Sequence, residues 1–205
     1  MTHTTQRAQR RGDWRAESAE KAALLLIVGI LSAGTLLAEQ NASPSPAASE
    51  AVVETAQGRF VIRLLPEIAP RHVQHFAKTA RAGGYDGTTF HRIIPHGIIQ
   101  GGDPLSKDKA KAALYGTGGL GLLKAEFSDR PMTRGAVAAV LRPSSKDSAG
   151  NQFFICLSDQ AALTGKFTIF GEVIDGMDVV DKIGETPVEG DRAKTRVEIQ
   201  KISVN

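Results

Sequence analysis

Short apolar runs recur along the chain from residue 51 onward, separated by turns rich in glycine and proline. The runs AVVETA (51–56) and RFVIRLL (59–65) flank Gln57-Gly58, and this spacing predicts a β-hairpin. Six later runs predict further strands, namely FHRII, GIIQG, GAVAAV, QFFICL, FTIFGEVI and RVEIQKISV. The pattern therefore predicts a mostly β domain over residues 51–205.

Two stretches have helical rather than strand periodicity. In RHVQHFAKTARAGG (71–84), the apolar residues recur at helical spacing and Gly83-Gly84 ends the pattern. MDVVDKIG (177–184) predicts a second, shorter helix before the last strand. Many short strands and two helices indicate a closed or sandwiched antiparallel sheet whose open ends the helices cover.

The first quarter of the chain has a different pattern. Residues 1–21 are polar and carry scattered basic and acidic side chains, whereas residues 22–38 contain no charge. Residues 39–50 (EQNASPSPAASE) have no bulky apolar residue and predict a flexible linker. We therefore expect one hydrophobic N-terminal helix ahead of the β domain.

The uncharged segment 22–38 has the length of a short membrane span. Its basic flank predicts that residues 1–21 form a cytoplasmic tail and that the following domain lies on the extracytoplasmic side, periplasmic or exported. We favour an uncleaved signal-anchor, because the small residues that a signal peptidase needs lie inside the apolar run. A cleaved signal peptide, which would give a secreted protein, is the alternative.

Composition excludes several classes. The formal net charge is +3 and the basic residues are scattered, so nucleic-acid binding is not predicted. The single cysteine, Cys156, allows no internal disulfide and lies in an apolar run. GTGGLG (116–121) matches a dinucleotide fingerprint but lacks the flanking strand and helix, so it predicts a surface loop. We expect no cofactor.

The histidines do not predict a metal site. His72 and His75 share a helix face, but nothing in the sequence brings them to His91 and His96, and metal sites usually add carboxylate or thiolate ligands. A serine hydrolase is not indicated either, because no G-x-S-x-G motif is present.

Three long motifs carry a specific resemblance. They are FHRIIPHGIIQGGD (90–103), AGNQFFI (149–155) and LTGKFTIFGEVIDGMDVV (163–180). In this order and spacing they resemble the cyclophilin family of peptidyl-prolyl isomerases, over roughly residues 51–205. The resemblance implies a closed eight-stranded antiparallel β-barrel capped by two α-helices, acting on proline-containing client polypeptides.

The chemistry implied by the resemblance needs no nucleophile. Rotation about an X–Pro bond is opposed by amide resonance, with a barrier of about 18–20 kcal/mol, so the site must bind the twisted amide better than either planar isomer. An arginine suits this task, because its donors can hold the prolyl carbonyl and approach the amide nitrogen. The resemblance assigns that role to Arg92. It places these residues in the substrate site: His91, Ile98, Gln100, Gln152, Phe154, Leu163 and Phe167.

Four positions depart from the family's pattern. Gly97 stands where the family has a pocket phenylalanine, Ala162 replaces a tryptophan and Phe167 replaces a histidine. In the predicted strand AVLR (139–142), Leu141 lies where backbone groups of the family normally line the substrate groove. Losing the aromatic ring at position 97 is expected to open the proline pocket, and Phe167 is a candidate to refill it.

The sequence thus predicts a monomeric, membrane-anchored isomerase that assists protein folding outside the cytoplasm. A peptide-binding or chaperone module of the same fold, with little turnover, is the alternative that Gly97 motivates. A purely structural tethered domain is the third class.

Overall fold

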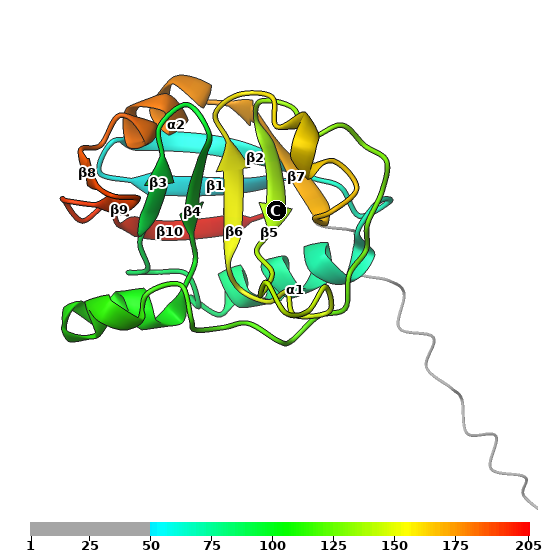
Figure 1. The fold of residues 1–205 in the computed structure, drawn as a ribbon, viewed down its shortest axis with the longest axis horizontal. Coiled ribbons are helices and arrows are strands. Elements are labelled where there is room, and N and C mark those ends of the chain that lie inside the picture. The colour runs from blue at the N-terminus through cyan, green and yellow to red at the C-terminus, as the bar shows by residue number, and fades with distance from the viewer. Residues whose placement is uncertain (1–49) are drawn as a thin grey trace, which may run out of the picture. The chain divides into compact units, whose positions relative to one another are not determined.

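The computed structural model describes residues 50–205, so the predicted tail, the segment 22–38 and all of the linker but Glu50 lie outside the described residues. The strands are β1 (Glu50–Thr55), β2 (Gly58–Leu64), β3 (Arg92–Ile94), β4 (Ile98–Gly101), β5 (Ala136–Ala139), β6 (Phe153–Cys156), β7 (Ile169–Asp175), β8 (Val188–Glu189), β9 (Arg192–Ala193) and β10 (Ile199–Val204). The helices are α1 (Pro70–Arg81) and α2 (Met177–Gly184), with 3-10 turns at Pro104–Lys107, Lys109–Leu114 and Ala161–Leu163. Figure 1 shows their arrangement.

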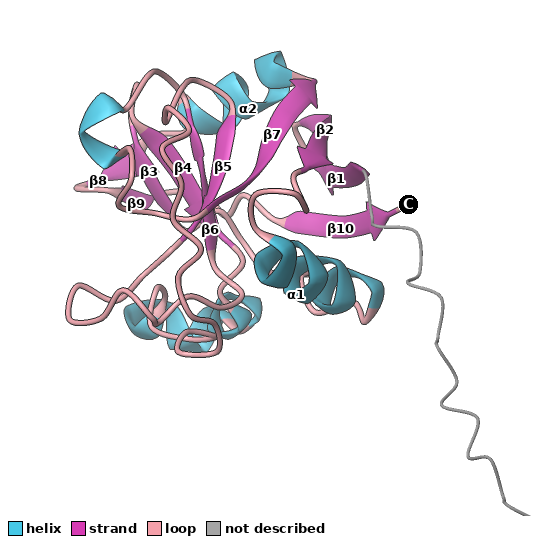
Figure 2. Cartoon of the chain, turned by 90° about the vertical axis from the view of Figure 1, so that its right-hand side faces the viewer, coloured by secondary structure: helices cyan, strands magenta, loops and turns pink. Residues whose placement is uncertain are grey.

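The described strands form one antiparallel sheet of ten strands, in the order β10-β1-β2-β7-β5-β6-β4-β3-β9-β8. The prediction of a closed eight-stranded barrel is therefore wrong in strand number and in closure. The mostly β composition and the two covering helices are as expected. Both helices contact the sheet, α1 next to β10 and α2 on the other side next to β2 and β4 (Figures 1 and 2).

Short pairing segments explain both differences from the expected barrel. The segment before β3 meets the segment before β10 through a single bridge, Thr89 to Glu198, rather than through a strand ladder. The two extra strands, β8 and β9, are a hairpin of two residues each, and only Arg192 pairs with β3. Gly190 adopts a φ of 65°, which a tight hairpin turn requires and which glycine adopts without strain.

The sheet separates two apolar clusters. The larger one lies between the curved sheet and the helices and includes Phe60, Phe90 and Phe153, each at most 1% exposed. α1 contributes Val73 and Phe76 to it, as the helical spacing predicted. The second cluster contains residues of β4, β5, β6 and β7 together with Leu65 and Met132. This second cluster positions the candidate site.

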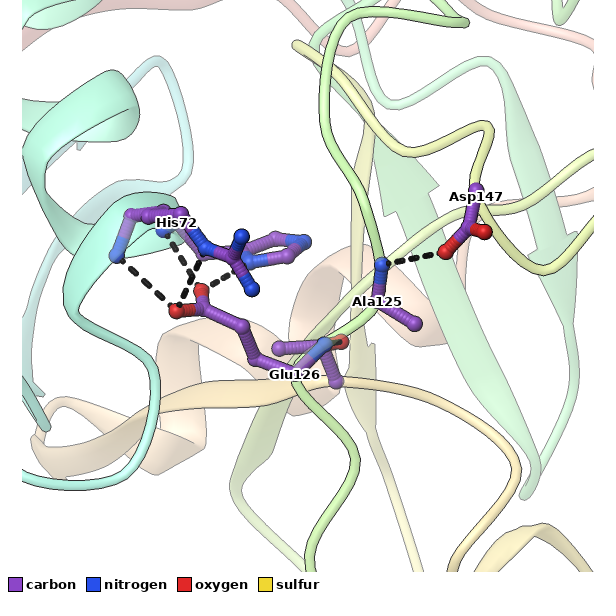
Figure 3. Close-up of polar contacts among 6 residues, drawn as sticks. His72, Ala125, Glu126 and Asp147 are labelled. Carbon is purple, nitrogen blue, oxygen red and sulfur yellow. Dashed lines mark hydrogen bonds and ion pairs between the residues drawn. The ribbon is translucent and has the colours of Figure 1, made fainter.

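A loop carboxylate caps the first turn of α1. The helix begins at Pro70 after Ala69, whose side chain offers no hydrogen-bond acceptor, so the first free backbone N–H groups need another partner. Glu126 accepts from the backbone N–H groups of Arg71 and His72 at 3.2 and 3.0 Å, and from the His72 Nδ1–H at 2.5 Å (Figure 3). A carboxylate at this position also complements the helix dipole.

The same loop is fixed to the sheet. The backbone N–H of Glu126 donates to the Thr168 hydroxyl at 2.9 Å. That of Ala125 donates to Asp147 at 3.0 Å (Figure 3). Thr168 directly follows Phe167, so the helix cap and one wall of the candidate site share an anchor point.

Between residues 50 and 205, no helix has the length and apolar character needed to cross a membrane.

Candidate active site

The strand register aligns the predicted polar residues. Arg92 of β3 lies directly opposite Gln100 of β4, and Gln100 lies opposite Phe154 of β6. Directly opposed residues in an antiparallel pair project from the same face of the sheet. Residues 62 positions apart in sequence are thereby brought into one row, with a cation at one end and an aromatic ring at the other.

A hydrogen-bond relay joins three of the predicted site residues. One terminal N–H of Arg92 donates to the Gln100 Oε1 at 3.3 Å, and the Gln100 Nε2 donates to the Gln152 Oε1 at 2.9 Å. Gln152 in turn donates to the carbonyl of Gly118 at 2.7 Å. Both glutamines are buried, so the relay fixes the orientation of their amides.

Asp103 anchors the far end of this relay. It is fully buried and accepts hydrogen bonds from the backbone N–H groups of Leu105, Gly116 and Gly118. Its second oxygen also lies 3.4 Å from the Gln152 Nε2. The glycine-rich loop 116–121 is thus held by a carboxylate, which agrees with the prediction of a loop rather than a dinucleotide site.

Arg92 has a second acceptor that the sequence did not reveal. Its Nε–H donates to the Asp191 Oδ2 at 2.6 Å, and this bond lowers the pKa of the Asp191 carboxyl. Asp191 lies in the β8–β9 turn, 99 positions from Arg92. With Nε held by Asp191 and one terminal nitrogen directed at Gln100, the guanidinium is fixed at two points.

The predicted apolar residues gather in the second cluster. Ile98 and Phe154 belong to it, and Leu163 and Phe167 pack against it. The rings of Phe154 and Phe167 meet edge to face, with centroids 5.3 Å apart. Phe154 is only 3% exposed, so Phe167 and its neighbours cover the ring that the resemblance assigns to the proline pocket.

The β3–β4 turn contains the largest departure from the family's pattern. His96 adopts a φ of 58° and is the only residue other than glycine with a positive φ in the part of the chain that the structure describes. A Cβ added to Gly97 would lie 2.9 Å from the Ile94 Cγ2 and 3.3 Å from the Ile94 carbonyl oxygen. An aromatic ring at position 97 would therefore require Ile94 to move.

His91 is not part of the relay. Its ring lies against Tyr115, with centroids 6.2 Å apart, and its Nδ1 lies 3.4 Å from the carbonyl of Thr89. Burial lowers the pKa of His91, so the ring is neutral near neutral pH. The structure thus separates His91 from the seven other predicted site residues.

Metal-binding side chains do not converge in the described part of the chain: residues 50–205 contain no group of three or more His, Cys, Asp or Glu able to hold an ion. His72 is bound to Glu126 and His75 to Asn151. Burial raises the pKa of the Cys156 thiol to about 12, so this cysteine is an unreactive core residue.

Three residues of structural importance were not predicted. Asp103 closes the QGGD motif, and an acidic residue directly after two glycines was the available signal. Glu126 and Asp191 lie in loops without periodicity, and each contacts a partner more than 50 positions away. No local sequence pattern could have identified these two.

The family is shown by comparison with known proteins. The profile described as "Cyclophilin type peptidyl-prolyl cis-trans isomerase/CLD" matches residues 51–204. The chain belongs to this family and is a cyclophilin-type peptidyl-prolyl cis-trans isomerase.

Individual relatives agree with this assignment. A "Probable peptidyl-prolyl cis-trans isomerase" of Brucella suis is 40% identical over 151 residues, covering 71% of this chain and 76% of the relative. A "Peptidyl-prolyl cis-trans isomerase-like 1" of Neurospora crassa is 38% identical over 160 residues, covering 77% of this chain and 94% of the relative. Among solved structures, a cyclophilin-type isomerase of Cryptosporidium parvum matches with a TM-score of 0.70 and 25% identity, over 77% of this chain and 98% of that chain.

Proposed function

We propose that the chain isomerises X–Pro bonds of client polypeptides outside the cytoplasm, with Arg92 stabilising the twisted amide. The observation that carries this proposal is the double fixation of the Arg92 guanidinium by Asp191 and Gln100. A donor group held in place before substrate arrives loses little free energy on orienting itself in the transition state. The remaining N–H groups of the guanidinium face no partner among residues 50–205.

The other residues of the site are proposed to bind the substrate peptide. Gln100 and Gln152 have oriented amides that suit hydrogen bonds to a peptide backbone, and the second apolar cluster at Phe154 suits a proline ring. A Cryptosporidium parvum relative is described as crystallised in the presence of the dipeptide Ala-Pro. That ligand supports short X–Pro segments as substrates of this chain. The extracytoplasmic location rests on residues 1–38, which lie outside the described residues.

Arg92→Ala in the full chain tests the mechanism. We expect kcat for a prolyl peptide to fall by about 10²–10³-fold, the usual cost of removing one preorganised donor. The unfolding midpoint should change little, because the Arg92–Asp191 pair is solvent-exposed at 39% and 56% and such pairs contribute little stability. Arg59→Ala, at an exposed arginine of β2, is the matched control and should keep full turnover. Wild-type turnover in Arg92→Ala would refute the assigned role.

A binding module with little turnover is a second candidate, and the burial of Phe154 favours it. If the ring stays covered by Phe167, a proline ring does not reach Phe154 and loses that wall of the pocket. The two functions separate in one experiment on the full chain: peptide binding by calorimetry together with isomerisation of the same peptide. Binding without acceleration would favour the binding module.

A further inference from the structure

A cavity of about 330 Å³ lies next to β3, outside the row of predicted site residues. It is open to solvent on one side and is lined by the segment before β3, the 3-10 turn Lys109–Leu114 and the stretch from β9 towards β10. In Figure 1 this 3-10 turn is part of the green helical segment below β3 and β9. The residues that matter for its chemistry are His91, Lys109, Tyr115, Arg192, Lys194 and Arg196.

Positively charged side chains line the cavity. Lys109, Arg192 and Lys194 line it, and none of the three forms an ion pair with a residue in the range 50–205. Arg196 differs, because each of its three guanidinium nitrogens already donates one hydrogen bond, to Glu198 or to the carbonyls of Ser106 and Gly87. Among the described residues, no aspartate or glutamate lines the cavity. Three free cations around one cavity favour a multiply charged anion.

A buried imidazole nitrogen gives a second, independent indication of a ligand. His91 lines the cavity and is 7% exposed, and its Nε2 has no hydrogen-bond partner among the described residues. Gly116 leaves space in front of this nitrogen, since even an added Cβ there would remain 3.6 Å away. Buried polar atoms without partners are rare in folded proteins and call for an explanation.

The other ring nitrogen decides which chemical group fits. The Nδ1 of His91 faces the Thr89 carbonyl, which can only accept, so Nδ1 carries the proton and Nε2 presents a lone pair. The missing partner must therefore donate a hydrogen bond, while the surrounding lysines and arginine require an anion. A carboxylate satisfies the cations but has no proton to donate near neutral pH. Phosphate satisfies both in the forms that keep a P–OH: inorganic phosphate has one in each of its two forms near neutral pH, and a phosphomonoester, whose second pKa is about 6, has one in its monoanion.

We propose that this cavity is a phosphate-binding site, with Lys109, Arg192 and Lys194 binding the charged oxygens and His91 accepting from the P–OH. The phosphate group comes either from free inorganic phosphate or from a phosphorylated side chain of a polypeptide. The site goes beyond the isomerase activity and does not depend on it. Arg192 pairs with Arg92 across β9 and β3, so the phosphate site and the catalytic arginine lie on neighbouring strands.

The test is a titration of the full chain with four probes: inorganic phosphate and proline-free peptides with phosphoserine, serine or glutamate at one position. Calorimetry measures affinity, and the ¹⁵N resonance of the His91 Nε2 reports the predicted hydrogen bond. We expect saturable binding of the two phosphate-bearing probes, with a shift of that resonance, and no binding of the serine or glutamate peptides. Whichever phosphate-bearing probe binds more tightly identifies the source, and either order supports the site.

Charge variants provide the control. The double variant K109Q/K194Q should weaken phosphate binding by about tenfold or more per charge removed, since hydrogen bonds to charged groups contribute about 1.5–3 kcal/mol. Its isomerase activity should be unchanged. The pair K78Q/K201Q removes the same charge at two exposed lysines of α1 and β10 and should bind phosphate normally. The proposal is overturned if neither phosphate probe binds, if the glutamate peptide binds equally well, or if both double variants weaken binding equally.

Discussion

Asp191 is the partner of Arg92, the proposed catalytic arginine, that only the structure reveals. Its carboxylate holds the Arg92 Nε at 2.6 Å from a turn that no motif marks. The pair is solvent-exposed and contributes little to stability, so its value lies in orienting the guanidinium. With Arg92 acting as proposed, we expect Asp191 to be a positioning residue rather than a group that touches the substrate.

Asp191→Asn should lower kcat with KM unchanged, because the interaction it supports is made chiefly with the twisted amide. We expect a loss of about ten- to a hundredfold, the scale seen when a catalytic group is slightly misplaced. Steady-state kinetics on a prolyl peptide measure kcat and KM separately. Asp191→Glu should recover part of the loss, and Glu189→Gln, in the same hairpin, should have no effect. A rise in KM at constant kcat would show that Asp191 only shapes substrate binding.

At the residue scale, the sequence revealed the groups that lie within motifs. Arg92 and Gln100 come from one stretch and Gln152 and Phe154 from another, and the sheet register then aligns the two stretches. Asp191 and Glu126 could not be found in this way. A single long-range contact by an exposed or loop residue leaves no period in the sequence, and only the folded chain brings the partners together.

At the element scale, α1 depends on Glu126 for its N-terminal cap. Glu126→Gln leaves one acceptor oxygen where the carboxylate offered two, so at least one helix N–H loses its partner. We expect the free energy of unfolding to fall by about 1–3 kcal/mol, measured by urea denaturation. Glu67→Gln, at an exposed residue shortly before the helix, is the control. Equal stability of the two variants would contradict the capping role.

The same cap predicts a pH dependence of stability. Burial lowers the pKa of His72 below its ordinary 6.5, so below about that pH the unfolded chain binds a proton that the folded chain resists. Burial alone would raise the pKa of Glu126, but hydrogen bonds from His72 and Arg71 lower it below 4.5. The stabilisation that ionised Glu126 gives the folded chain is therefore present above pH 4.5 and is lost as the pH falls through the pKa of Glu126 in the folded state. Urea midpoints should decrease on acidification in both ranges, and Glu126→Gln should lack the lower step.

We expect the β3–β4 turn and Phe167, two residues before β7, to limit the proposed proline pocket. Gly97→Phe alone should gain little turnover, because its Cβ presses on Ile94 and Phe167 already covers Phe154. Paired with Phe167→His, it should raise kcat/KM by about ten- to a hundredfold, since a buried aromatic ring contributes about 1.5–3 kcal/mol. Gly97→Ala tests the crowding at Ile94 without adding a ring. If kcat/KM of the double variant does not exceed that of the unmodified protein, the missing aromatic ring at position 97 is not what limits activity.

Elements with a clear period were predicted well, and the irregular ones were not. The β1–β2 hairpin and α1 follow the predicted stretches closely because each has several residues of regular spacing. The hairpin of β8 and β9 has two residues in each strand, too few for any alternation. The 3-10 turns are likewise too short to carry a periodic signal.

At the scale of the whole molecule, the order of motifs identified the family but overstated the closure of the sheet. Closure depends on how many residues pair between β3 and β10, and a single bridge at Thr89 and Glu198, in the segments before these two strands, stands where a ladder was expected. The backbone nevertheless continues to bond on both sides of that bridge, with Phe90 donating to Val197 and Ile199 donating to Thr88. The core is thus enclosed at this seam by irregular hydrogen bonds as well as by strands.

The location of the domain rests on the uncharged segment 22–38, which lies outside the described residues. We expect the segment to remain as an anchor, so that the mature protein keeps its full mass and sediments with membranes. Ile30→Arg places a charge at the centre of the segment, where insertion then costs about 2.5–3.5 kcal/mol more, and it should shift the protein out of the membrane fraction. Ile30→Leu is the matched control and should remain there. Mass spectrometry of the purified protein separates the two topologies, because a mature chain beginning near Thr35 or Glu39 would mean that the segment is a cleaved signal peptide and the isomerase is secreted.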